Sequence, residues 1–113
     1  MTPANANLLR GTLELLILRA VSGGPRHGYG ILEWLERRVA PELLVEEGTL
    51  YPALHRLEED GLIASSWGQS ENNRRAKYYR LTRAGVRRVA RESAAWRAYA
   101  DRVLGALDGE APA

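Results

Sequence analysis

The sequence contains no cysteine and only two histidines among its 113 residues. Without cysteine the chain has no disulfide framework, no thiolate metal site and no cysteine nucleophile. The histidines, His27 and His55, fall on separate predicted helices and form no recognisable set of metal ligands. No pairing of a nucleophile with a base and no phosphate-loop spacing is visible. We therefore expect neither an enzyme nor a metal sensor, and no cofactor.

Long apolar runs are also lacking. No run approaches the roughly 20 residues that span a bilayer. The opening residues, MTPANANLLRG, do not place a charged region before a long apolar one, as a secretion signal would. Together with the missing cysteines, this predicts a cytoplasmic, nucleoid-associated protein without a membrane partner. The length predicts one domain with a modest core, which burial across a dimer interface would help.

The net charge of +2 is small, but the charges are unevenly distributed. Residues 1–71 carry ten acids and six bases, whereas residues 72–113 carry four acids and ten bases. Between Asn72 and Arg91 there are eight basic residues and no acid. This asymmetry is typical of a DNA-facing edge. The alternative is a solvated charged face, although such faces usually intersperse both signs.

Helical spacing predicts two helices in the first third of the chain. The first, Leu8–Val21, is apolar nearly all round, which indicates burial on more than one side. We expect it to contact its own core and, through Leu8 and Leu15, a partner chain. The second runs from about His27 to Val39, and the glycines of its HGYG start are expected to admit a backbone or a phosphate. Leu43–Val45 are predicted as a short extended piece.

A third helix is predicted from about Gly48 to Asp60, ended by Gly61. Leu50, Leu54 and Leu57 recur at helical spacing and predict its core stripe. The opposite side offers groups that can reach DNA: Thr49, Tyr51, Pro52, His55 and Arg56.

The chemistry of this third helix suits a recognition helix. Gly48 and Thr49 bring N–H groups and a hydroxyl to a helix N-terminus, where a phosphate oxygen is favoured. Tyr51 can donate to a phosphate or lie on a thymine methyl, and the alternative is a core aromatic. Arg56 can pair with guanine, which is worth about 1–3 kcal/mol of discrimination. For His55 a DNA contact and a plain exposed residue remain equally open.

Leu62–Trp67 and Lys77–Thr82 alternate with period two and predict two strands joined by a polar connection. Helix followed by a basic-tipped hairpin is the layout of a winged helix. Because phosphate contact needs only positive charge, we expect this wing to contact the backbone or minor groove and to set affinity more than sequence preference. The predicted wing contacts are Asn73, Arg74, Arg75 and Lys77; Asn72 and Asn73 suit a tight, sometimes left-handed, hairpin tip.

A long final helix, capped by the hydroxyl of Thr82 and reaching about Leu107, carries an uninterrupted heptad seam. Its own short domain leaves little for this seam to pack against, so we expect a homodimer; the alternative is a helix folded back on its own core. The small residues Ser93 and Ala100, at the seam positions before and after Trp96, leave room for a flat aromatic effector between the two chains. The alternative is that Trp96 simply fills the interface. The predicted seam is Val86, Val89, Ser93, Trp96, Ala100, Val103 and Leu107.

Four successive segments resemble the PadR-like transcriptional regulators: LLRGTLELLILRA, GPRHGYGI, GTLYPALHRLEEDGLI and NNRRAKYYRLTRAG. The resemblance extends from Leu8 to about Trp96. It implies a dimeric winged helix-turn-helix repressor on an inverted-repeat operator, a C-terminal dimerisation helix and, in some members, aromatic small molecules bound at or near the dimer interface. The family's DNA-contacting positions map onto Tyr29 of the second helix, Gly48, Thr49, Tyr51 and Pro52 of the recognition helix, and Arg74, Arg75 and Lys77 of the wing.

One departure concerns Glu46 and Glu47, which stand where many relatives carry Ser or Pro. Two carboxylates suit a helix N-terminus but repel phosphates, so DNA is expected to be met one turn later than Gly48.

We predict a mainly α fold with a small β-hairpin wing, that is, a winged helix-turn-helix with a long C-terminal helix. The DNA-binding domain is expected over residues 8–82, the dimerisation helix over 83–107, and flexible tails over 1–7 and 108–113. The predicted function is sequence-specific binding of double-stranded DNA by a homodimeric repressor. The alternative is a winged-helix module that binds protein, which would have no need of eight bases without an acid.

Overall fold

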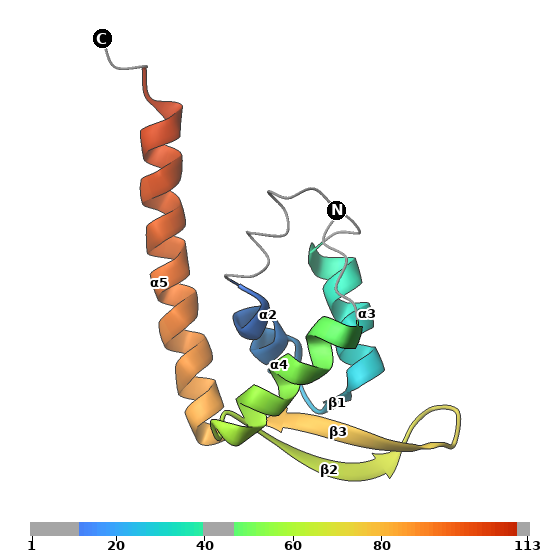
Figure 1. Ribbon diagram of the computed structural model, residues 1–113. Helices are drawn as coiled ribbons and strands as arrows, with labels where there is room; N and C mark the ends of the chain where they lie inside the picture. Colours follow the sequence, from blue (N-terminus) through green and yellow to red (C-terminus); the bar gives the residue numbers. More distant parts are fainter. Residues whose placement is uncertain (1–11, 40–46, 111–113) are drawn as a thin grey trace.

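The computed structural model describes residues 12–39 and 47–110. Within these ranges there are four helices and a small sheet; three of the helices pack over the sheet and the last extends away from it (Figure 1). The elements in chain order are α2 (Leu13–Ala20), β1 (Arg26–His27), α3 (Gly28–Val39), α4 (Glu47–Glu59), β2 (Ile63–Gln69), β3 (Arg75–Leu81) and α5 (Arg83–Asp108).

Figure 1 shows α2, α3 and α4 gathered above the sheet, with the β2–β3 hairpin projecting to one side and α5 standing apart on the other. The radius of gyration is 16.2 Å, against about 13 Å for a compact domain of similar length. The long axis measures 62 Å. The elongation follows from α5, whose 26 residues rise well beyond the core.

The core lies where α2, α3 and α4 meet the base of the hairpin. The predicted stripe of α4 is confirmed, since Leu50, Leu54 and Leu57 are all almost fully buried. Their spacing of four and three residues places them on one side of the helix. The other almost fully buried large side chains are Ile17, Leu18, Ile31, Leu35 and Ile63.

Helix α2 covers the described part of the helix predicted from Leu8 to Val21. Leu8 lies outside the described residues, as does the extended piece predicted at Leu43–Val45. Leu15 is half-buried on α2. Within the described ranges, no helix has the length and apolar character needed to cross a membrane.

The helix predicted from about His27 to Val39 is confirmed as α3, but strand β1, which immediately precedes it, was not predicted. Arg26 and His27 pair antiparallel with Tyr79 and Tyr78 of β3, which makes a three-stranded sheet in the order β1-β3-β2. Two residues are too few to show the alternation that marks a strand in a sequence. His27 also serves the helix that follows, because its Nδ1 accepts a hydrogen bond from the N–H of Gly30 at 2.9 Å.

The hairpin is longer than predicted, since β2 reaches Gln69 and β3 begins at Arg75. At its tip the N–H of Asn73 donates to the carbonyl of Ser70 at 2.9 Å, and the N–H of Ser70 donates to the carbonyl of Arg74 at 2.8 Å. Asn73 itself is left-handed, with φ of 60°. A turn followed by one left-handed residue is a common three-residue hairpin loop. The predicted left-handed tip is therefore confirmed at Asn73.

The junctions around α4 and α5 follow the predicted caps. Gly61 has φ of +74°, and the N–H of Leu62 reaches back to the carbonyl of Leu57 at 3.0 Å, which closes α4. The hydroxyl of Thr82 accepts from the N–H of Gly85 at 3.1 Å and donates to the carbonyl of Gly61 at 2.6 Å. These bonds fix the start of α5 against the end of α4. The fold is the predicted winged helix-turn-helix with an added C-terminal helix.

Candidate nucleic-acid interface

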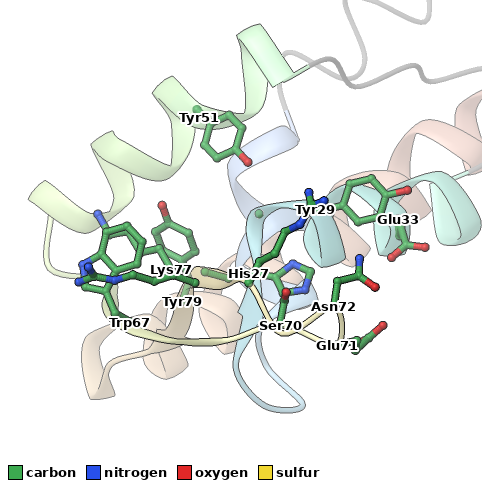
Figure 2. Close-up of a pocket in the computed structure, with 14 residues that line it drawn as sticks. His27, Tyr29, Glu33, Tyr51, Trp67, Ser70, Glu71, Asn72, Lys77 and Tyr79 are labelled. Carbon is green, nitrogen blue, oxygen red and sulfur yellow. The ribbon is translucent and has the colours of Figure 1, made fainter.

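A groove of about 500 Å³ separates the start of α3 and the side of α4 from the hairpin (Figure 2). Five residues predicted as DNA contacts line it together: Tyr29, Tyr51, Arg74, Arg75 and Lys77. They come from three separate elements, which only the fold brings to one surface. The lining also includes residues that were not predicted, among them His27, Gly28, Glu33, Trp67 and Asn72.

Tyr51 crosses the groove from α4 toward the start of α3 (Figure 2). A Cβ added at Gly28 would lie 2.6 Å from the phenol oxygen of Tyr51. The missing side chain at Gly28, the first glycine of HGYG, therefore makes room for the phenol of Tyr51, where the sequence predicts a backbone or a phosphate. With 46% of its surface exposed, Tyr51 is not a core aromatic, and its ring remains accessible from the groove.

Tyr29 lies on the first turn of α3, on the same side of the groove as Tyr51, with 61% of its surface exposed. Figure 2 shows its ring beside Glu33 on the same helix. Two exposed phenols thus line the groove from α3 and α4. Phenol hydroxyls can donate to phosphate oxygens, so this side of the groove suits a nucleic-acid backbone.

The hairpin wall is formed by the face of β2 and β3 directed toward α4, which we term the inner face. Ser65 lies opposite Tyr79 and Trp67 opposite Lys77 in the register, and residues directly opposite each other share a face. This is the alternation expected from the sequence. Tyr79, at the base, is buried, and that burial raises the pKa of its phenol.

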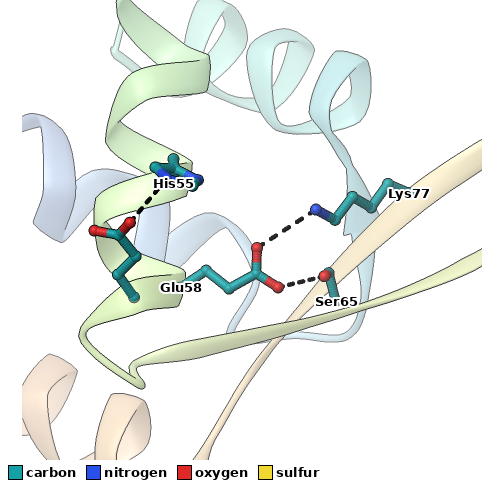
Figure 3. Close-up of polar contacts among 5 residues, drawn as sticks. His55, Glu58, Ser65 and Lys77 are labelled. Carbon is teal, nitrogen blue, oxygen red and sulfur yellow. Dashed lines mark hydrogen bonds and ion pairs between the residues drawn. The ribbon is translucent and has the colours of Figure 1, made fainter.

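Glu58 joins α4 to the inner face (Figure 3). Its carboxylate accepts a hydrogen bond from the hydroxyl of Ser65, and Lys77 Nζ lies 3.5 Å from its Oε1. The hydrogen bond from Ser65 lowers the pKa of Glu58, burial opposes that shift, and the charge of Lys77 adds to it. Lys77, predicted as a wing contact, thus has an acidic neighbour on α4.

Two predicted contacts of α4 have partners outside the groove. Arg56 Nε lies 3.2 Å from Oε1 of Glu14 on α2. His55 Nε2 lies 2.9 Å from Oε1 of Glu59, one turn along α4. Both pairs are well exposed, so each exchanges readily with solvent. The predicted contacts that do not line the groove are Gly48, Thr49, Pro52, His55, Arg56 and Asn73, all exposed.

The basic run of residues 72–91 does not form a single surface. Arg74 and Arg75 are exposed beside the groove. Arg80 is one residue out of phase with Tyr79, so it points to the other face of β3. Arg88 is paired with Glu92 at 2.7 Å on α5. The positive charge nearest the groove therefore comes chiefly from the hairpin tip.

The heptad seam of α5 is divided between core and solvent. Val89 packs against the chain's own core, whereas Val86, Trp96, Val103 and Leu107 are exposed. Ser93 and Ala100 are half-buried. The rings of Trp96 and Tyr99 meet edge to face, with centroids 6.1 Å apart. Beyond its first turns, α5 thus presents an apolar strip that the described residues of its own chain leave open.

The chain matches the transcriptional regulator PadR-like family over residues 17–91. A transcriptional regulator of Mycobacterium tuberculosis is 36% identical over 99 residues, which cover 85% of this chain and 86% of that protein. A PadR family regulator from Eggerthella lenta has a structure with a TM-score of 0.78 and 35% identity, covering 93% of this chain and 89% of that one. A PadR-like regulator from Bacillus cereus has a TM-score of 0.83 and 29% identity, covering 92% and 99%. The chain belongs to the PadR-like family of transcriptional regulators.

Proposed function

We propose that the protein is a sequence-specific DNA-binding repressor that occupies an inverted-repeat operator as a homodimer. The observation that carries this proposal is the groove in which exposed Tyr29 and Tyr51 face the cationic tip of the hairpin. A recognition helix in the major groove and a wing on the backbone would require both elements to be open on the same side. The family supports DNA binding as the activity.

The domain division follows from the same proposal. Residues 8–82 would form the DNA-binding domain and residues 83–107 the dimerisation helix. The support for dimerisation is the exposed apolar strip of α5, where Leu107 alone leaves 73% of its surface open. Pairing two such strips would bury apolar surface that is otherwise hydrated. It would also present two recognition helices to successive turns of one duplex, with half-sites about 10–10.5 bp apart.

We further propose that a planar aromatic effector binds between the paired helices beside Trp96. The support is the exposed ring of Trp96 with half-buried Ser93 and Ala100 at the adjacent seam positions, three residues before it and four after it. An aromatic ligand stacked there would quench tryptophan fluorescence. Trp96→Ala is expected to abolish most of the quenching, and the Trp34→Phe, Trp67→Phe double variant to retain it. Loss of the response in the double variant instead would remove the pocket from the proposal.

Salt dependence tests the DNA-binding proposal directly. A dimer that makes 6–10 phosphate contacts loses roughly 10³–10⁵ in affinity between 50 and 200 mM salt. We expect a labelled duplex containing the DNA upstream of the chain's own gene to show that loss and to yield a palindromic footprint. Replacing Arg74 and Arg75 together with alanine should weaken binding and flatten the salt slope by about two. Affinity that ignores salt, or that survives the double substitution unchanged, would refute the proposal.

A further inference from the structure

The inner face of the hairpin changes character from base to tip. Tyr79 at the base is buried, and Lys77 in the middle is held near Glu58. Trp67, directly opposite Lys77, leaves 60% of its surface exposed. Such exposure is unusual for the largest side chain on a face that packs against a helix. Trp67 therefore needs an explanation other than packing in the core.

The indole of Trp67 supports the side chain of Arg75. The guanidinium carbon of Arg75 lies 4.5 Å from the centre of the Trp67 ring. The register makes this contact possible, because Arg75 lies opposite Gln69 and is thus the diagonal neighbour of Trp67. Diagonal neighbours on one face are within reach of long and aromatic side chains. A cation over an indole at this distance is attracted by the ring's negative face.

Both cations of the inner face lie over aromatic rings, Lys77 at 5.7 Å from the centre of the Tyr79 ring, but they differ in whether an acid is close by. Lys77 lies beside a carboxylate, which offsets its charge. Arg75 lies over a neutral ring, and in the described part of the chain no acidic side chain comes within 4.0 Å of it to form an ion pair. The positive charge of Arg75 is therefore not offset by an ion pair, while stacking on Trp67 restrains the position of its guanidinium. Both residues line the groove.

The geometry of a guanidinium makes this support useful. All five N–H donors of arginine lie in the plane of the group, so stacking on a ring covers the face and leaves the donor edge open. That edge matches the paired oxygens of a phosphate. Restraint also lowers the side-chain entropy that arginine loses when it binds a phosphate.

We propose that Trp67 is a positioning residue for DNA binding, which holds the guanidinium of Arg75 with its donor edge open to a phosphodiester of one DNA strand. The inference rests on the proposed DNA binding and adds to it a residue outside the predicted contacts. Trp67 acts through Arg75, so its contribution disappears when Arg75 is absent.

The test uses a fluorescently labelled duplex of mixed sequence, because phosphate contacts are independent of sequence. Arg75→Ala is expected to weaken binding about tenfold at low salt and to lower the salt slope by about one. Trp67→Ala is expected to weaken binding about three- to tenfold with a similar loss of slope. In the Arg75→Ala background, Trp67→Ala should change neither quantity. Trp67→Phe, which keeps an aromatic face, should restore most of the affinity.

A matched control exists on α3, where Arg38 lies 5.6 Å from the ring centre of Trp34. Neither residue lines the groove, so Arg38→Ala removes an equivalent stacked cation and is expected to leave affinity and slope unchanged. If Trp67→Ala unfolds in a circular-dichroism melt, the comparison of Trp67→Leu with Trp67→Phe decides, since leucine is apolar but has no π face. Leucine is then expected to bind like the Arg75→Ala variant.

Two results would overturn the inference. The first is that Trp67→Ala (or Trp67→Leu, if the alanine variant unfolds) binds with wild-type affinity and salt slope. The second is that this variant weakens binding by the same factor in the presence and in the absence of Arg75. In either case the wild-type protein still shows a steep salt slope, so the proposed function stands. A wild-type protein that binds no duplex, or binds it without salt dependence, would instead refute the proposed function itself.

Discussion

The phenol of Tyr51 lies against Gly28, so closely that an added Cβ would stand 2.6 Å from the phenol oxygen. This contact joins the recognition helix α4 to the start of α3 across the groove. Its existence depends on the absence of a side chain at position 28. The orientation of an exposed aromatic on the candidate DNA surface is thus set by a buried glycine on another helix.

Gly28→Ala is therefore expected to displace the Tyr51 ring, to cost about 1–3 kcal/mol of unfolding free energy and to weaken DNA binding. Urea unfolding and duplex titration measure the two effects. Adding Tyr51→Ala should relieve most of the stability cost, because the clash then has no partner. Gly23→Ala is the control, since nothing lies within 4 Å of a Cβ there. An equal cost of Gly28→Ala with and without Tyr51 would contradict the explanation.

A second position, Gly85, has no room for a side chain because of a neighbouring backbone carbonyl. A Cβ at Gly85 would overlap the carbonyl oxygen of Leu62, and a carbonyl held at the junction of α4 with the hairpin cannot move aside as a flexible side chain can. We expect Gly85→Ala to cost at least about 3 kcal/mol. Gly105→Ala, on the same helix with open space around it, should instead stabilise α5 by about 0.5–1 kcal/mol. Thermal unfolding at one fixed protein concentration compares the two variants, and a tolerated Gly85→Ala would contradict the tight packing.

The sequence predicts the helices, the hairpin and their caps because each depends on local chemistry. The cap of Thr82 on the N–H of Gly85 spans three residues, and Gly61 and Asn73 owe their left-handed conformations to their own positions in a helix end and a turn. The leucine stripe of α4 follows from helical spacing in the same way. Such features can be predicted before any tertiary contact is known.

The remaining features depend on residues distant in the chain. Strand β1 forms because β3 offers it an edge, and two residues leave no periodic signal. Gly28 meets Tyr51 only once α3 and α4 have packed. Trp67 had a partial signal, since alternation already placed it on the same strand face as Ser65, but its pairing with Arg75 depends on the register of the hairpin.

The lowered pKa of Glu58 predicts a pH-dependent contribution to stability. Its folded pKa lies below the ordinary value of 4.5, so the contribution is present above that value and is lost as pH falls through the lowered one. Glu58→Gln should cost about 1 kcal/mol at pH 7 and progressively less below pH 4.5. Chemical unfolding across this range measures it. Glu59→Gln, which removes only the exposed pair with His55, should cost a few tenths of a kcal/mol at most. A Glu58→Gln penalty that is constant with pH would contradict the assignment.

The apolar strip of α5 provides the last prediction, which concerns assembly. Val103 and Leu107 occupy successive seam positions and are exposed in the single chain, so a carboxylate at each would be buried without a partner in the proposed dimer. The double variant Val103→Glu, Leu107→Glu is expected to sediment as a monomer at micromolar concentration. Its duplex affinity should fall because two half-sites are then bound independently. Ala98→Glu adds one carboxylate on the side of α5 away from the seam and should remain dimeric. A dimeric double variant would exclude this strip as the interface, and a monomeric wild type would exclude the homodimer altogether.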